Sequence, residues 1–190
     1  MPNLKYKLLP LGFLYFIALT SLGSSSNAAT KLEPHSPPFT LPFDTKKIGQ
    51  TYTFDVKVAE PLVYAVRLRF YINKPSKYSH FLDSYSLEDD KRLRTILGGA
   101  VLADSGTWIE PGVPAKFLVQ INTSADNKPL LSELIDHPKI ASMHMGRYTD
   151  LVQKKLSAGI YTIRVGYLQG DPELGTLQAE ILFARAHHGK

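Results

Sequence analysis

The feature that most constrains this chain is a strict alternation of apolar and polar residues in two neighbouring segments. Between positions 51 and 58, one face carries Tyr52, Phe54, Val56 and Val58. Between positions 62 and 72 the apolar residues again take every second place, and the polar face carries Arg67, Arg69 and Tyr71. A period of two buries one side of a strand but not one side of a helix. The two segments therefore predict adjacent strands, joined as a hairpin that places Asp55 and Lys57 beside the two arginines.

Other short segments repeat this pattern between turn residues. Strands are predicted near 39–43, where Pro42 suggests a sheet edge, and near 115–121, 139–145, 156–167 and 176–186. The alternating pattern is interrupted once, where Ser86 and Asp89 form a capping box that predicts the start of a helix over Ser86–Leu97. Together these elements predict an all-β fold, an antiparallel Ig-like β-sandwich with one short helical insertion, over 39–190. The pattern is least informative over Leu130–Val152.

Two residues carry a structural prediction of their own. Gly159 lies just before an inward-facing Tyr161, a pattern typical of the tyrosine corner of Ig-like sandwiches. In that motif the phenol is hydrogen bonded to backbone at the entrance of a strand.

The amino-terminal segment is typical of an export signal. Lys5 and Lys7 precede an apolar run, Leu8–Leu19, and small residues follow, so cleavage is expected after Ala28 or Ala29. The alternative is a retained membrane anchor, but this run is shorter than the ~20 apolar residues that a spanning helix needs. A flexible Pro-rich leader would then cover 30–38. We expect a periplasmic or secreted protein without a stable membrane anchor.

Charge and cysteine content exclude several classes of function. The chain has 22 Lys and Arg against 17 Asp and Glu, a formal charge of +5. Removing 1–29 takes away two lysines and leaves 20 against 17, or +3, and the basic residues are dispersed. Nucleic-acid binding is therefore not expected, because it needs a concentrated basic face. The absence of cysteine excludes disulfides, thiolate metal sites and a lipid-modified cysteine.

Three motifs, in order, carry a family resemblance. They are Phe43-Asp44 with Gly49 and Tyr52; Glu110-Pro111-Gly112-Val113-Pro114; and Leu156 to Tyr161, closing in Asp171-Pro172-Glu173-Leu174. Together they resemble DUF5625, a proteobacterial domain-of-unknown-function family of exported proteins and lipoproteins, from Phe39 to the carboxyl end. The resemblance implies a small β-sandwich and supplies no catalytic residues. The missing lipid-acceptor cysteine favours a soluble exported form.

Catalytic and metal-binding motifs are not found. The six histidines lack the spacing of a zinc-protease helix, and no Gly-x-Ser-x-Gly elbow occurs in the mature chain. A site at His137, with Asp136 and His144, would require the loop between them to fold back. Asp89 and Asp90 could bind a cation, but acidic residues also favour a helix amino terminus. We expect no enzyme activity, cofactor or metal.

The remaining candidates are residue types that dominate protein interfaces: Arg67, Arg69, Tyr71, Tyr78 and Trp108. An exported sandwich with long loops and no catalytic motif favours a non-catalytic protein-binding module, such as an inhibitor or immunity-type partner of a secreted protein. Its partner would be another envelope or secreted protein. The alternatives are a carbohydrate or small-ligand binder, and an envelope structural subunit that pairs through edge strands.

Overall fold

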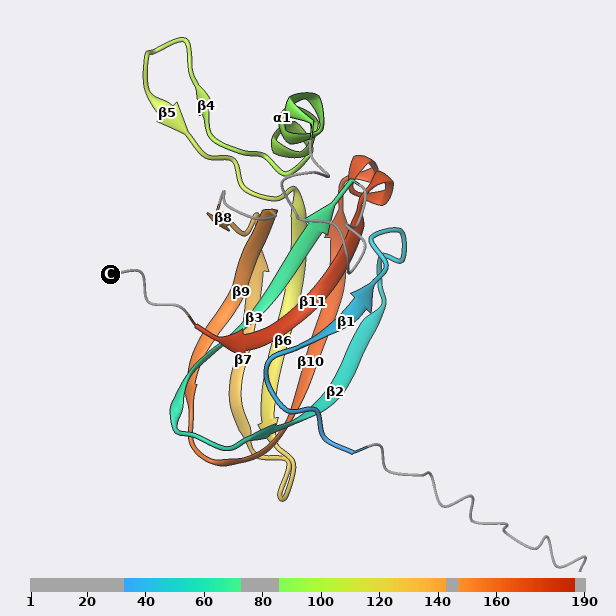
Figure 1. Ribbon diagram of the computed structural model, residues 1–190, viewed down its shortest axis with the longest axis vertical. Helices are drawn as coiled ribbons and strands as arrows, with labels where there is room; N and C mark the ends of the chain where they lie inside the picture. The colour runs from blue at the N-terminus through green and yellow to red at the C-terminus, as the bar shows by residue number, and fades with distance from the viewer. Residues whose placement is uncertain (1–32, 73–85, 143–146, 187–190) are drawn as a thin grey trace, which may run out of the picture. The chain divides into compact units, whose positions relative to one another are not determined.

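Two antiparallel sheets form the body of the protein (Figure 1). The computed structural model describes residues 33–72, 86–142 and 147–186. One sheet has the order β1 (Phe39–Phe43), β11 (Gln178–Arg185), β3 (Leu62–Tyr71), β9 (Arg147–Leu156) and β8 (Ile140–Ser142). The other has the order β2 (Thr51–Val58), β10 (Gly159–Gly170), β6 (Ala115–Thr123) and β7 (Pro129–Asp136). The antiparallel β-sandwich predicted from the alternation is confirmed.

The apolar faces of the two sheets meet in one core. Fully buried members from five strands are Val56, Leu68, Phe117, Ile163 and Ile181. Burying each such side chain contributes about 1.5–3 kcal/mol. Near one end of the core, Phe43, Phe117 and Tyr167 pack as an aromatic cluster with ring centroids 5.3–6.2 Å apart. The alternating residues of the sequence thus become the inner faces of the sandwich.

The strand order is that of a jelly roll. When β8 and the small β4–β5 pair are left out and the other eight strands are numbered along the chain, the sheets read 1-8-3-6 and 2-7-4-5. An immunoglobulin domain instead places its first, second, fifth and fourth strands in one sheet. Here every connection crosses between the sheets except the β6–β7 hairpin, as in the double Greek key of a jelly roll. The Ig-like connectivity is therefore corrected to a jelly roll.

This order also overturns the predicted hairpin between the first two alternating segments. β2 pairs with β10 and β3 pairs with β11 and β9, so the two segments lie in different sheets. Asp55 accepts a hydrogen bond from Thr162 instead of meeting the arginines. Periodicity predicts a strand and its buried face, but it does not determine which strand lies beside it.

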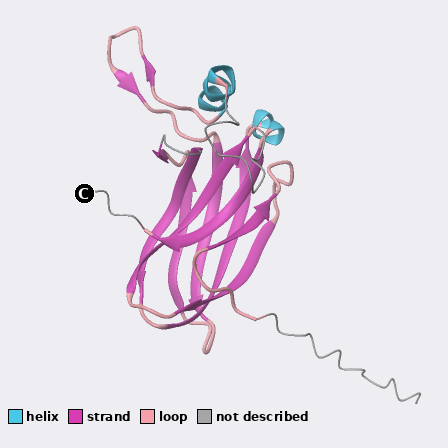
Figure 2. Ribbon diagram, viewed as in Figure 1, coloured by secondary structure: helices cyan, strands magenta, loops and turns pink. Residues whose placement is uncertain are grey.

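The jelly-roll order gathers the long connections at one end of the sandwich, called the loop end below (Figure 2). Helix α1 (Leu87–Ile96), the hairpin of β4 (Val101–Leu102) and β5 (Trp108–Ile109), and the 3-10 helix η2 (Pro172–Thr176) all lie there. The strand connections at the opposite end are short and cover 59–61, 124–128 and 157–158. The single helical insertion predicted over Ser86–Leu97 is confirmed as α1.

The amino-terminal region is described from Glu33 onward. In the predicted leader, the His35 amide donates to the Asp55 carbonyl at 2.9 Å, and the Lys57 amide donates back to the His35 carbonyl at 2.8 Å. The imidazole stacks on Phe39, with ring centroids 4.5 Å apart. The predicted signal segment lies outside the described residues, as do Tyr78 and His144. Within the described ranges, no helix is long and apolar enough to cross a membrane.

Candidate functional site at the loop end

Helix α1 begins at the predicted cap and is tied to the sandwich. The Ser86 hydroxyl accepts a hydrogen bond from the Asp89 amide at 3.0 Å, and Leu93, Ile96 and Leu97 are buried. Asp90 forms ion pairs with Arg94, at 3.2 Å, and with the buried Arg147 of β9. These contacts give Asp90 a structural role and leave the alternative cation site without support.

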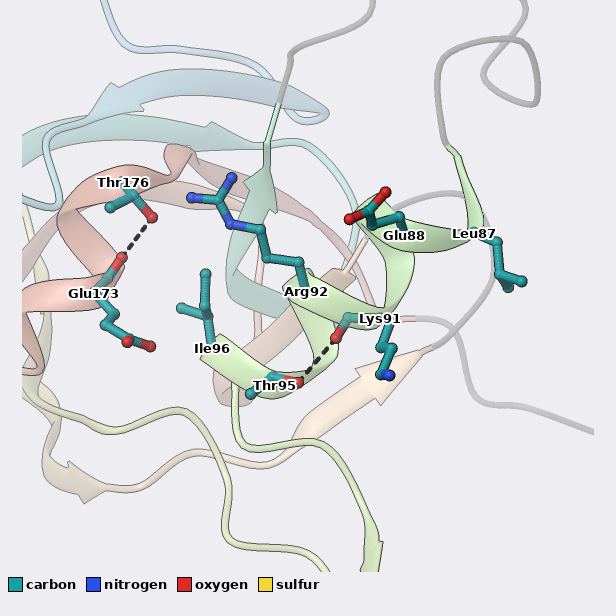
Figure 3. A pocket seen from close by; sticks show the side chains of 8 residues that line it. All are labelled: Leu87, Glu88, Lys91, Arg92, Thr95, Ile96, Glu173 and Thr176. Atoms are coloured by element: carbon teal, nitrogen blue, oxygen red, sulfur yellow. Dashed lines mark hydrogen bonds between the residues drawn. The ribbon is translucent and has the colours of Figure 1, made fainter.

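A groove separates α1 from η2 (Figure 3). Its volume is about 850 Å³. Arg92 and Ile96 point from α1 toward η2, whereas Leu87 and Lys91 point away from it. The rim carries two acidic and two basic side chains, Glu88, Glu173, Lys91 and Arg92. The groove is therefore electrically balanced and favours neither an anionic nor a cationic ligand.

The β4–β5 hairpin carries a concentration of exposed apolar side chains. Val101, Leu102, Trp108 and Ile109, called the apolar quartet below, are 49%, 58%, 70% and 48% exposed. Val101 pairs with Ile109, and Leu102 pairs with Trp108. Neighbouring residues on a strand point to opposite faces, so each face of the hairpin carries one of these pairs. The hairpin is apolar on both faces.

The base of this hairpin is held by two glycines in close contact. The Gly112 amide donates to the Gly98 carbonyl at 3.0 Å, and Gly98 and Gly112 have φ of +61° and +85°. A Cβ on Gly98 would lie 2.1 Å from the Gly112 oxygen, and one on Gly112 would lie 2.3 Å from the His137 oxygen. Only glycine fits at either position, so the hairpin leaves the sandwich at a fixed point.

A small polar cleft lies beside that base. It is lined by residues that include Asp136, His137, Gln169 and Asp171. The Asp136 carboxylate contacts His137 Nδ1 at 2.9 Å and Lys116 Nζ at 3.4 Å. Desolvation acts to raise the pKa of Asp136, but Lys116 and His137 outweigh it and hold the pKa below its ordinary 3.8. Asp171 instead caps η2 by accepting from the Glu173 amide at 2.8 Å.

The candidate binding residues of β3 are placed differently from the prediction. They lie on the outer side of their sheet, yet Arg67 and Tyr71 are each only 4% exposed. Arg67 pairs with Asp150 and lies over the Tyr148 ring, 5.2 Å from its centroid. Tyr71 accepts from Arg69 at 3.2 Å and donates to Glu180 at 3.1 Å. Arg67 and Tyr71 are therefore buried rather than exposed, and Arg69 is half-buried, because neighbouring strands supply partners that a single sequence does not show.

Of the predicted binding residues that the structure describes, Trp108 alone is exposed at the loop end. Val101, Leu102 and Ile109 were not predicted. The signal was present, because Val101-Leu102 and Trp108-Ile109 flank the turn-forming Asp104-Ser105-Gly106, an arrangement that indicates a hairpin.

The Tyr161 hydroxyl donates to the Ser157 carbonyl at 2.9 Å, which is the bond expected of a tyrosine corner. Gly159 lies against it, with the place of a Cβ 3.4 Å from the phenol oxygen. The contact occurs in a jelly roll, so it stabilises a strand entrance here without indicating an immunoglobulin fold.

In the part of the chain that the structure describes, no group of three or more acidic or histidine side chains could hold a metal ion.

Fold and site together define a jelly-roll domain that is elaborated at one end around a projecting apolar hairpin. The chain belongs to the family of the domain of unknown function DUF5625, whose model matches residues 40–185. It is also similar in fold to the crystal structure of GEBA250068378 from Sulfurospirillum deleyianum, with a TM-score of 0.59 and 18% sequence identity. That similarity covers 78% of this chain and 97% of the other. No curated protein matches.

Proposed function

We propose that this protein is a non-catalytic binding module that recognises another exported protein through its loop end. The observation that carries the proposal is the apolar quartet, which the jelly roll places on a hairpin projecting from the elaborated end. Contiguous exposed apolar side chains on a folded domain mark a surface that is covered by a partner. Tryptophan is among the residues that contribute most to such interfaces. An exported location is part of the proposal and rests on the signal-like pattern of residues 1–29.

A carbohydrate-binding role has less support. Sugar recognition combines an aromatic platform with polar groups that fix the orientation of the ligand. Tyr71 is buried, and the Trp108 ring is paired across the hairpin with Leu102, so this ring has aliphatic neighbours. A thermal-shift screen against a glycan panel tests this alternative, and we expect no stabilisation.

A structural subunit that polymerises through strand edges also has less support, because the sheet edges carry blocking features. Pro42 interrupts β1, and β8 has three residues. On β7, Glu133 is paired with the buried Val119, so a charge faces inward at the edge. The β2 edge is hydrogen bonded to His35. These are devices that keep edge strands from pairing with other chains.

The experiment compares capture by three forms of the full chain, each carrying a carboxyl-terminal tag and produced in its own cells. They are the wild type, the loop-end variant Leu87→Ser/Ile109→Ser, and the control Ile160→Ser. Ile160 is a suitable control because it is 43% exposed and lies at the opposite end. We expect one exported protein to be retained in stoichiometric amount by the wild type and the control and to be lost from the loop-end variant. An empty wild-type column, or equal retention by all three, would refute the proposal.

A further inference from the structure

The hairpin has three features that together specify what can cover it. Both of its faces are apolar, its turn is acidic, and its base is fixed to the sandwich. We propose that the hairpin of residues 98–112 inserts as a plug into an apolar cleft of the partner protein, and that this cleft carries basic side chains at its floor and its rim. This inference deepens the proposed function and rests on it.

The pairing of the quartet side chains across the hairpin indicates that the partner covers them with a cleft. A flat partner surface could cover the Val101–Ile109 face or the Leu102–Trp108 face, but it would leave the other pair in water. A cleft with two walls covers both at once. The four side chains are between 48% and 70% exposed. Enclosure on both sides therefore removes the most apolar surface from water.

The negative charge of the hairpin indicates that the partner's cleft carries basic side chains. Residues 100–112 include Asp104 and Glu110 and contain no lysine, arginine or histidine. Asp104 lies in the turn, closed by hydrogen bonds between Ala103 and Thr107 at 2.9 Å and between Gly106 and Ala103 at 2.8 Å. Because the turn leads on insertion, the Asp104 carboxylate reaches the floor of the cleft. A carboxylate taken out of water needs a cationic or hydrogen-bonding partner there. Glu110, next to the base, meets the rim.

The same charges argue against a membrane as the occupant. An exposed Trp, Leu, Ile and Val on a loop could enter a lipid interface. Here the acidic turn would enter first, which costs free energy in the hydrocarbon, and both acids would be repelled by anionic headgroups. A protein cleft with positive charge suits the hairpin better than either kind of bilayer.

The fixed base of the hairpin favours tight binding to the partner. Gly98 and Gly112 hold the two ends of the hairpin 3.0 Å apart between backbone atoms, and the Val113 amide donates to the Pro138 carbonyl at 2.9 Å. Val113 itself is fully buried. A hairpin attached to the core in this way loses less freedom on binding than a free loop would, and this preorganisation increases affinity.

Site-specific photo-crosslinking in the producing cells tests the proposal. The full chain carries p-benzoylphenylalanine in place of Ile109, of Leu87 or of Ile160, one position at a time. The two isoleucines are matched in type and exposure, at 48% and 43%. We expect an adduct with one other protein from position 109 and none from position 160. Mass spectrometry is expected to place the crosslinked peptide in an apolar cleft next to lysine or arginine.

Affinity measurements on the purified partner complete the test. Trp108→Ser is expected to weaken binding about thirtyfold, the factor equivalent to about 2 kcal/mol for a central tryptophan. Asp104→Lys is expected to weaken it about tenfold or more, and added salt is expected to slow association. Trp108 is the only tryptophan of the chain, so its emission reports on the hairpin directly. We expect a blue shift and protection from acrylamide with the partner, and no change with phosphatidylcholine vesicles with or without phosphatidylglycerol.

The outcomes that overturn the plug are distinct from those that overturn the binding module. An adduct from position 87 and none from position 109 would leave the module standing and refute the plug. An adduct of two copies of this chain, or a blue shift with vesicles, would also refute it. Unchanged affinity of Asp104→Lys would refute the basic floor. No adduct from either loop-end position would refute the module itself, and the plug with it.

Discussion

The glycine at the hairpin base gives the sharpest test of the structural argument. In Gly112→Ala, the new Cβ would lie 2.3 Å from the His137 carbonyl oxygen, where real contacts are not shorter than 3.0 Å. Something must therefore move by about 0.7 Å, the difference between the two distances. The backbone on both sides is fixed, because the Gly112 and Val113 amides donate to Gly98 and Pro138. Breaking those two hydrogen bonds costs about 1–3 kcal/mol.

The alanine also has to adopt a positive φ, which costs about 1–2 kcal/mol by itself. Gly106 in the hairpin turn is the matched control, since its φ is +77° and nothing lies within 4 Å of its Cβ position. The free energy of unfolding of Gly106→Ala should therefore fall by no more than the cost of the positive φ. That of Gly112→Ala should fall by about 1–3 kcal/mol more. The free energy of unfolding is measured by urea titration with circular dichroism. Equal losses in the two variants would refute the close contact at the base.

Three further predictions concern the body of the sandwich. Tyr161→Phe removes the bond to the Ser157 carbonyl and should lower the free energy of unfolding by about 1 kcal/mol, measured by urea titration. Arg67→Met removes the cationic partner of the Asp150 carboxylate, which keeps its hydrogen bond from the Gln153 amide at 2.6 Å, and should destabilise the protein by about 3 kcal/mol. Unchanged stability would mean that the ion pair contributes nothing. Burial raises the pKa of the Tyr71 phenol above its ordinary 10.0, with Arg69 acting in the opposite direction. A raised folded-state pKa stabilises the protein fully below about pH 10, and this contribution is lost as pH rises through the folded value. Tyr71→Phe should therefore flatten the alkaline fall in stability, measured by unfolding at a series of pH values.

Local signals in the sequence were sufficient for the elements themselves. The alternation of β2 and β3 identified both strands and their inner faces, because burial on one side imposes a period of two. Ser86 and Asp89 identified the start of α1, because the cap is made within three residues. Pro42 identified an edge strand, because proline removes a donor from the ladder. Each of these signals can be seen within a few consecutive residues of the chain.

The connectivity and the burial of β3 depend on contacts distant in the chain, and there the predictions were wrong. β2 and β3 are separated by three residues, which suits a hairpin, but each pairs with a strand from the last third of the chain. Arg67 and Tyr71 alternate as exposed residues do. They are buried because Asp150 and Glu180, at separations of 83 and 109 residues, supply charged and hydrogen-bonding partners. No pattern within one strand carries that information.

The position of the candidate site follows from strand order more than from any motif. In a jelly roll the connections between consecutive strands alternate between the two ends, so the insertion after β3 shares an end with those after β1, β7 and β10. Additions to any of these four connections enlarge the same surface, and the sandwich below them need not change. This placement explains why α1, the hairpin and η2 lie at the same end although Pro172, where η2 begins, lies 86 residues after Ser86. The proposed binding surface can therefore vary through loops that the core positions but does not constrain.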